Sequence, residues 1–84
     1  MKIKLLYFGR PRDTLKRPGE TADLPPGIAT VAEMLAWLRQ RGPEWQAELA
    51  ENRVRCAVNQ ELGALTAPLH DGDEVAIFSP ISGG

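Results

Sequence analysis

Apolar and polar side chains alternate over residues 2–8, which is the period of a β-strand. One parity carries Ile3, Leu5 and Tyr7, and the other carries Leu6 and Phe8 after two lysines. Stretches with the same period predict further strands at residues 21–24, 54–59, 62–65 and 74–78. Between the first two strands, glycines, prolines and charged residues predict a long, mobile turn.

From residue 30 the apolar side chains repeat with the period of an α-helix. Thr30 and Glu33 have the spacing of a capping box, in which each side chain accepts a hydrogen bond from a free backbone N–H at a helix start. Val31, Met34, Leu35 and Leu38 then repeat at helical spacing, so one face of this helix is apolar. Gly42 ends it, and Pro43 predicts a shorter second helix through Glu51, with Trp45 and Leu49 packing inward.

This element order predicts an α+β fold in two layers: a mixed sheet with one main helix packed on one face and a short second helix. We divide the chain into one domain, residues 1–78, and a flexible tail, residues 79–84. If the helix covers the parity of Ile3, the opposite face of the sheet carries Leu6, Phe8, Ala57, Ala76 and Phe78. An apolar outer face predicts a protein-docking surface.

Composition narrows the class of protein. The 84 residues suffice for one core, and 43% hydrophobic with 25% charged residues is typical of a globular domain. A net charge of −1 argues against a nucleic-acid partner. A single cysteine and the lack of a long apolar run predict a cytoplasmic protein with no membrane partner.

Side chains suited to catalysis are scarce. No P-loop or dinucleotide-binding glycine motif is present, and one cysteine with one histidine is too few for a metal site. Cys56 has inward parity, which favours a small core residue over a nucleophile. His70 is predicted to be a solvated turn residue. Trp37 and Trp45 are interpreted as packing residues.

A short basic run precedes the second strand. It is predicted to lie in a solvated loop, with steering of an acidic partner or a phosphate group as the alternative. Its members are Arg10, Arg12, Lys16 and Arg17.

The remaining candidate for chemistry is the end of the chain: Ile81, Ser82, Gly83 and Gly84. Two glycines give the tail a minimal cross-section, so it could enter a narrow channel in another protein. The terminal carboxylate, with a pKa of about 3.5, is ionised at neutral pH and resists nucleophiles until it is activated. An acyl-adenylate would allow conversion to a thiocarboxylate or an amide; a frayed terminus is the alternative.

Three segments, residues 2–13, 56–62 and 69–84, resemble the MoaD family of small, sulfur-carrying subunits of molybdopterin synthase. The resemblance extends over the whole length and implies a β-grasp, ubiquitin-like fold. It implies that Gly84 is the reactive residue and that Phe8, Leu62 and Phe78 contact the partner. Ser79-Pro80 departs from the two prolines of many members.

The resemblance also implies a reaction sequence. A MoeB-type enzyme would adenylylate Gly84 with ATP and magnesium, and a sulfur donor protein would convert it to a thiocarboxylate. The tail would then insert into a MoaE-type large subunit, in a heterotetramer, and pass sulfur to cyclic pyranopterin monophosphate. The chain itself would hold no permanent cofactor and would not be an enzyme alone. Sulfur carriage for thiamine or tRNA thiolation, and ubiquitin-like protein modification, remain alternatives.

Overall fold

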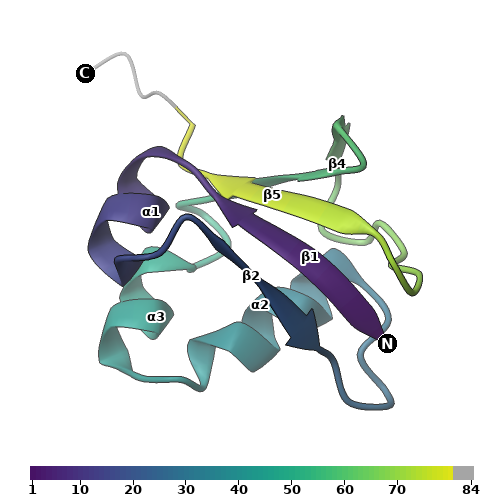
Figure 1. The fold of residues 1–84 in the computed structure, drawn as a ribbon. Helices are drawn as coiled ribbons and strands as arrows, with labels where there is room; N and C mark the ends of the chain where they lie inside the picture. The colour runs from purple at the N-terminus through teal and green to yellow at the C-terminus, as the bar shows by residue number, and fades with distance from the viewer. Residues whose placement is uncertain (81–84) are drawn as a thin grey trace.

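The computed structural model describes residues 1–80, and a five-stranded sheet organises them in the order β2-β1-β5-β3-β4 (Figure 1). The strands are β1 (Lys2–Tyr7), β2 (Gly19–Asp23), β3 (Arg55–Val58), β4 (Glu61–Gly63) and β5 (Glu74–Phe78). β1 and β5 run parallel at the centre, and every other neighbouring pair is antiparallel. The predicted mixed sheet is therefore confirmed.

The main helix, α2 (Val31–Arg39), begins at the predicted capping box. Thr30 Oγ1 accepts a hydrogen bond from the Glu33 backbone N–H at 3.3 Å, and Glu33 Oε1 accepts one from the Thr30 N–H at 3.1 Å. The apolar face of α2 is fully covered, with Leu35 and Leu38 at 0% exposure. This helix closes one face of the sheet (Figure 1).

The core forms between that helix layer and the inner parity of the strands. From the sheet it contains Ile3, Leu5, Tyr7, Ala22, Cys56, Val75 and Ile77. Burying an aliphatic side chain of this size contributes about 1.5–3 kcal/mol, so this layer dominates the stability of the domain. The inward parity predicted from alternation is confirmed.

The predicted turn after β1 is wrong. Residues Gly9–Leu15 form a helix, α1, whose buried side chains are Pro11 and Leu15. Proline is tolerated there because it lies in the first helical turn, where backbone N–H groups have no partner within the helix. Arg10 Nε lies 3.3 Å from the Glu48 carboxylate, which is 6% exposed, and this ion pair ties α1 to α3.

The second helix, α3, is shorter than predicted and spans Pro43–Glu48. Leu49 is fully buried, as expected, and Trp45 packs partly buried against the core. Each helix in the described part of the chain is too short or too polar to cross a membrane. Of the predicted tail, Ser79 and Pro80 are described, whereas Ile81, Ser82, Gly83 and Gly84 lie outside the described residues.

Candidate docking face

The sheet face opposite α2 carries a continuous apolar row across four strands. Leu6 of β1 pairs with Ala76 of β5, Ala76 pairs with Ala57 of β3, and Ala57 pairs with Leu62 of β4. Paired residues project from the same side of a sheet, so these four side chains form one band. We call this band, together with Phe8 and Phe78, the docking face.

Two of the four large side chains of the docking face are open to solvent. Leu62 is 72% exposed and Phe8 is 46% exposed, while Leu6 and Phe78 are half-buried. Apolar groups of this size contribute little to the stability of the domain when they remain in water. A cluster of them on one flat face is the usual mark of an interaction site.

Charged side chains border this band. Lys4 and Glu74 are paired across β1 and β5 on the same face, and Arg55 pairs with Phe78. An apolar centre inside a charged rim is the arrangement found in protein–protein interfaces, where the rim sets orientation and the centre provides affinity.

Gly19 shapes the edge of the docking face on β2. It pairs with Leu6, and a Cβ atom at this position would lie 2.6 Å from the Leu5 carbonyl oxygen and 3.3 Å from Leu6 Cδ2. The close approach of β2 to the Leu5 carbonyl therefore requires glycine at this position.

The reactive residues predicted at the end of the chain cannot be placed against this face, since residues 81–84 are not described. The described part does show where the last strand ends. β5 ends at Phe78, and the Phe8 N–H donates to the Ile77 carbonyl at 3.0 Å beside it. The chain thus leaves the sheet next to two aromatic members of the docking face.

Cys56 is buried at 3% exposure, as its parity predicts. Burial raises the pKa of its thiol to about 12, so the thiolate is scarce at neutral pH. His70 is exposed in the turn before β5, with Nδ1 3.9 Å from an Asp73 carboxylate oxygen. Among residues 1–80, no group of three or more His, Cys, Asp or Glu side chains could hold a metal ion.

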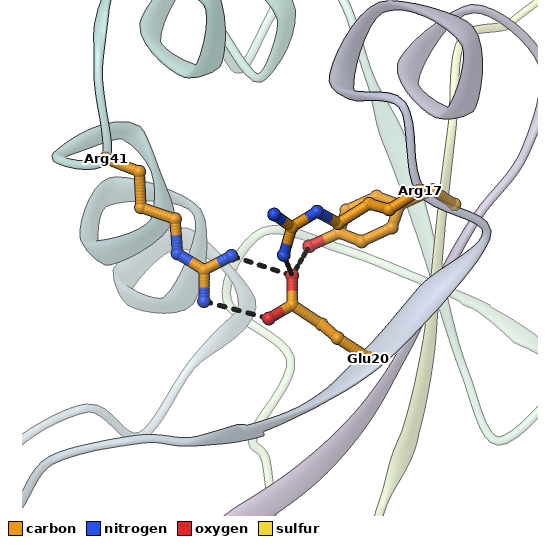
Figure 2. A network of polar contacts seen from close by, with 4 residues as sticks. Arg17, Glu20 and Arg41 are labelled. Atoms are coloured by element: carbon orange, nitrogen blue, oxygen red, sulfur yellow. Dashed lines mark hydrogen bonds and ion pairs between the residues drawn. The ribbon is translucent and has the colours of Figure 1, made fainter.

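A polar cluster on the helix side of the sheet has no counterpart in the sequence analysis (Figure 2). The Glu20 carboxylate accepts two hydrogen bonds from Arg41, at 2.7 and 3.0 Å, one from Arg17 at 3.1 Å and one from the Tyr7 hydroxyl at 2.8 Å. The two guanidinium groups lie 4.6 and 5.2 Å from the centre of the Trp45 ring. The cluster connects edge strand β2 to the helical layer.

This arrangement corrects the interpretation of the basic run as a solvated loop. Arg10 and Arg12 belong to α1, Lys16 is its C-cap, and Arg17 is engaged with Glu20. Burial alone would raise the pKa of Glu20, but hydrogen bonds from Arg41 and Tyr7 and the two positive charges outweigh it and lower the pKa.

Comparison with known proteins identifies the family to which this chain belongs. The model of the ThiS family matches residues 5–84, almost the entire chain. The chain belongs to the ThiS family. Its members' shared fold accounts for the mixed sheet and its helical cover, and the predicted ubiquitin-like class is confirmed.

Two relatives carry the same description. The chain is 32% identical over 82 residues to the molybdopterin synthase sulfur carrier subunit of Escherichia coli, covering 98% of this chain and 99% of the relative. It is 34% identical over 85 residues to the subunit of that name from Mycobacterium tuberculosis, covering 100% and 99%. The resemblance predicted from the sequence is confirmed, and both relatives support the predicted sulfur-carrier role.

Solved structures of similar proteins share the fold of this chain. A molybdopterin converting factor subunit 1 from Pyrococcus furiosus superposes with a TM-score of 0.80 at 29% identity, covering 96% of this chain and 99% of the other. SAMP1 from Haloferax volcanii gives 0.76 at 26% identity, covering both chains fully. A chain in the complex of subunits 1 and 2 of the Helicobacter pylori molybdopterin-converting factor gives a TM-score of 0.66 at 24% identity, again over the full length of both chains, which shows the shared fold.

Proposed function

We propose that this chain is the sulfur carrier subunit of a molybdopterin synthase and that the carboxylate of Gly84 carries the sulfur. The observation that supports this most directly is the exposed docking face beside the end of β5. A carrier needs a rigid surface by which other enzymes hold it and a thin end that enters their active sites. Gly83 and Gly84 meet the second need because they lack side chains.

The proposed chemistry begins with activation by a MoeB-type enzyme that uses ATP and magnesium. The Gly84 carboxylate attacks the α-phosphorus of ATP and releases pyrophosphate, giving an acyl-adenylate. The terminal sulfur of a persulfide on a sulfur donor protein then attacks the acyl carbon and displaces AMP. A thiol cleaves the resulting acyl disulfide, which releases the thiocarboxylate and leaves a disulfide between that thiol and the donor. In this proposal the chain contributes the carbonyl carbon and no catalytic side chain.

The proposed partner of the docking face is a MoaE-type large subunit. The solved complex of subunits 1 and 2 from Helicobacter pylori shares this fold, and the relatives are themselves named as subunits. We propose that Leu6, Phe8, Leu62 and Phe78 pack on the large subunit, with Ile81, Ser82, Gly83 and Gly84 extending into its active site. A heterotetramer of two small and two large subunits is the expected assembly.

Intact mass spectrometry of the protein from its native cells tests the carrier role. The expected result is a species heavier by the difference between a sulfur and an oxygen atom, absent after deletion of Gly84. Thiocarboxylated protein mixed with the purified large subunit and cyclic pyranopterin monophosphate should then yield the dithiolene. An unchanged mass during active cofactor synthesis would contradict the proposal.

Two alternatives use the same activated tail. The similarity to SAMP1, the small archaeal modifier protein 1 of Haloferax volcanii, favours protein modification as the second candidate. That function predicts conjugates that survive reducing denaturation. Carriage of sulfur for thiamine or tRNA predicts a thiocarboxylate that yields thiazole or thiolated tRNA but no dithiolene.

A further inference from the structure

The hairpin that joins β3 to β4 turns through two residues, of which asparagine is common in such turns and glutamine is not. Val58 pairs with Glu61, so the loop consists of Asn59 and Gln60 alone. Both have positive φ, 51° and 71°, and neither is glycine. Two-residue hairpin loops with positive φ at both positions strongly favour glycine at the second, because a side chain crowds the backbone there. Something outside the loop must therefore hold this turn.

Asn59 provides that hold through the first residues of β5. Its Nδ2 donates to the Asp73 carboxylate at 2.9 Å, and its Oδ1 accepts from the Glu74 N–H at 3.0 Å. Its own backbone N–H donates to the Glu74 carbonyl at 2.8 Å. Both ends of the side-chain amide are thus used, and asparagine tolerates the left-handed region better than most residues.

This hairpin turn also determines on which face of the sheet Leu62 lies. β4 is one of the two edge strands and is joined to the sheet by three residue pairs with β3. In a hairpin the register depends on the turn, and a slip of one residue moves every side chain to the opposite face. Leu62 is 72% exposed, so its own packing does little to hold the register.

We propose that Asn59 is a positioning residue for the docking face: by holding the hairpin turn it presents Leu62 to the apolar surface of the partner subunit. This inference rests on the proposed function, because it assigns Leu62 to the interface. Asn59 acts through Leu62 and lies at the opposite end of β5 from Phe8, whose N–H bonds to Ile77. The two aromatic contacts at that end are independent of the turn.

A double-mutant cycle tests this with the full chain and the purified large subunit from the same organism, using calorimetry or biolayer interferometry. Asn59→Ala should weaken binding about tenfold, and Asn59→Gly, which restores freedom of φ, should weaken it less. In a Leu62→Ala background, Asn59→Ala should change affinity by less than about twofold, whereas in a Phe8→Ala background its full effect should remain. Asn52→Ala, the same change at an exposed position with ordinary φ, is the matched control.

The outcomes separate the two proposals. Normal binding by Leu62→Ala and Phe8→Ala together would contradict the docking face itself, and with it this inference. Weakened binding by both, with Asn59→Ala equal to the parent chain, would overturn the inference alone. Equal effects of Asn59→Ala in all three backgrounds would also overturn it, because they would indicate a general loss of folding. If Asn59→Ala does not fold, Asn59→Gly carries the same cycle, with a smaller expected effect of about threefold.

Discussion

The two faces of the sheet both carry apolar side chains, but those of the inner face are buried and two of the large ones on the outer face are exposed. The inner face places Leu5, Val75 and Ile77 at 0% exposure beneath the helices. The outer face leaves Phe8 and Leu62 at 46% and 72% exposure. The same hydrophobic effect therefore stabilises the domain on one side and remains available for association on the other. Alternation along a strand separates these roles at adjacent residues.

The largest expected effect on stability follows from truncating a leucine on each side of the sheet, one in α2 and one in β4. Leu35→Ala empties a fully buried site and should lower the free energy of unfolding by about 2–5 kcal/mol. Leu62→Ala, at the exposed edge, should change it by less than about 0.5 kcal/mol. Urea unfolding followed by tryptophan fluorescence measures both. Equal losses would show that the outer face also contributes to the core.

Charged substitutions on the docking face should weaken binding to the large subunit and leave the stability of the domain nearly unchanged. Phe8→Lys or Phe78→Lys places an ammonium group at an apolar contact and should weaken association with the large subunit by about tenfold or more. Thermal unfolding of the variant alone should change little. Ala36→Lys, on the exposed side of α2, is the matched control. Normal binding by both phenylalanine variants would mean that another surface docks.

The Glu20 cluster should give a smaller, pH-dependent effect on stability. Glu20→Gln removes the charge that holds Arg17, Arg41 and Tyr7 (Figure 2) and should lower the free energy of unfolding by about 1–2 kcal/mol at pH 7. The pKa of Glu20 is lower in the folded state than its ordinary value of 4.5, so the parent's advantage is present above that value. It should decline as the pH falls below 4.5 toward the lowered pKa. A difference between the two proteins that is constant from pH 7 to 3 would contradict this.

The smallest expected signal comes from Cys56. Because burial raises the pKa of its thiol to about 12, iodoacetamide at pH 8 should leave the folded protein unmodified over an hour and label it fully in denaturant. Mass spectrometry measures the adduct. Rapid labelling of the folded protein would place Cys56 on an accessible surface and weaken the distinction between the two faces.

α1 and α2 show how far local sequence determines a helix. α2 was predictable because its capping box and its apolar spacing lie within ten residues. α1 begins at Gly9, after an N-cap residue, Phe8, whose side chain makes no capping hydrogen bond. It contains Pro11 and is followed by a left-handed C-cap, Lys16. Its stability comes from contacts with distant parts of the chain, including the Arg10–Glu48 ion pair. Pro11 and Leu15, four residues apart, were the one apolar signal of its buried face.

The candidate site divides in the same way. Parity along single strands predicted the outward direction of Leu6, Phe8 and Phe78. The sequence gives no sign that Glu20 meets Arg41, which is 21 residues away, because that contact depends on how β2 lies against the helical layer. The hydrogen bonds from the Asn59 side chain to the start of β5 likewise depend on strand order.

The sequence by itself determined most of the strand and helix periods, the separation of an apolar inner parity from the outer parity that carries Leu6, Phe8 and Phe78, and the two-glycine end. These properties are local, since they depend on the direction of neighbouring side chains and on the size of single residues. Only the tertiary structure decided that α1 is a helix, that Leu6, Ala76, Ala57 and Leu62 align in one row, and that Asn59 anchors the turn beside them. Such features need residues far apart in the chain to meet, and strand order brings them together.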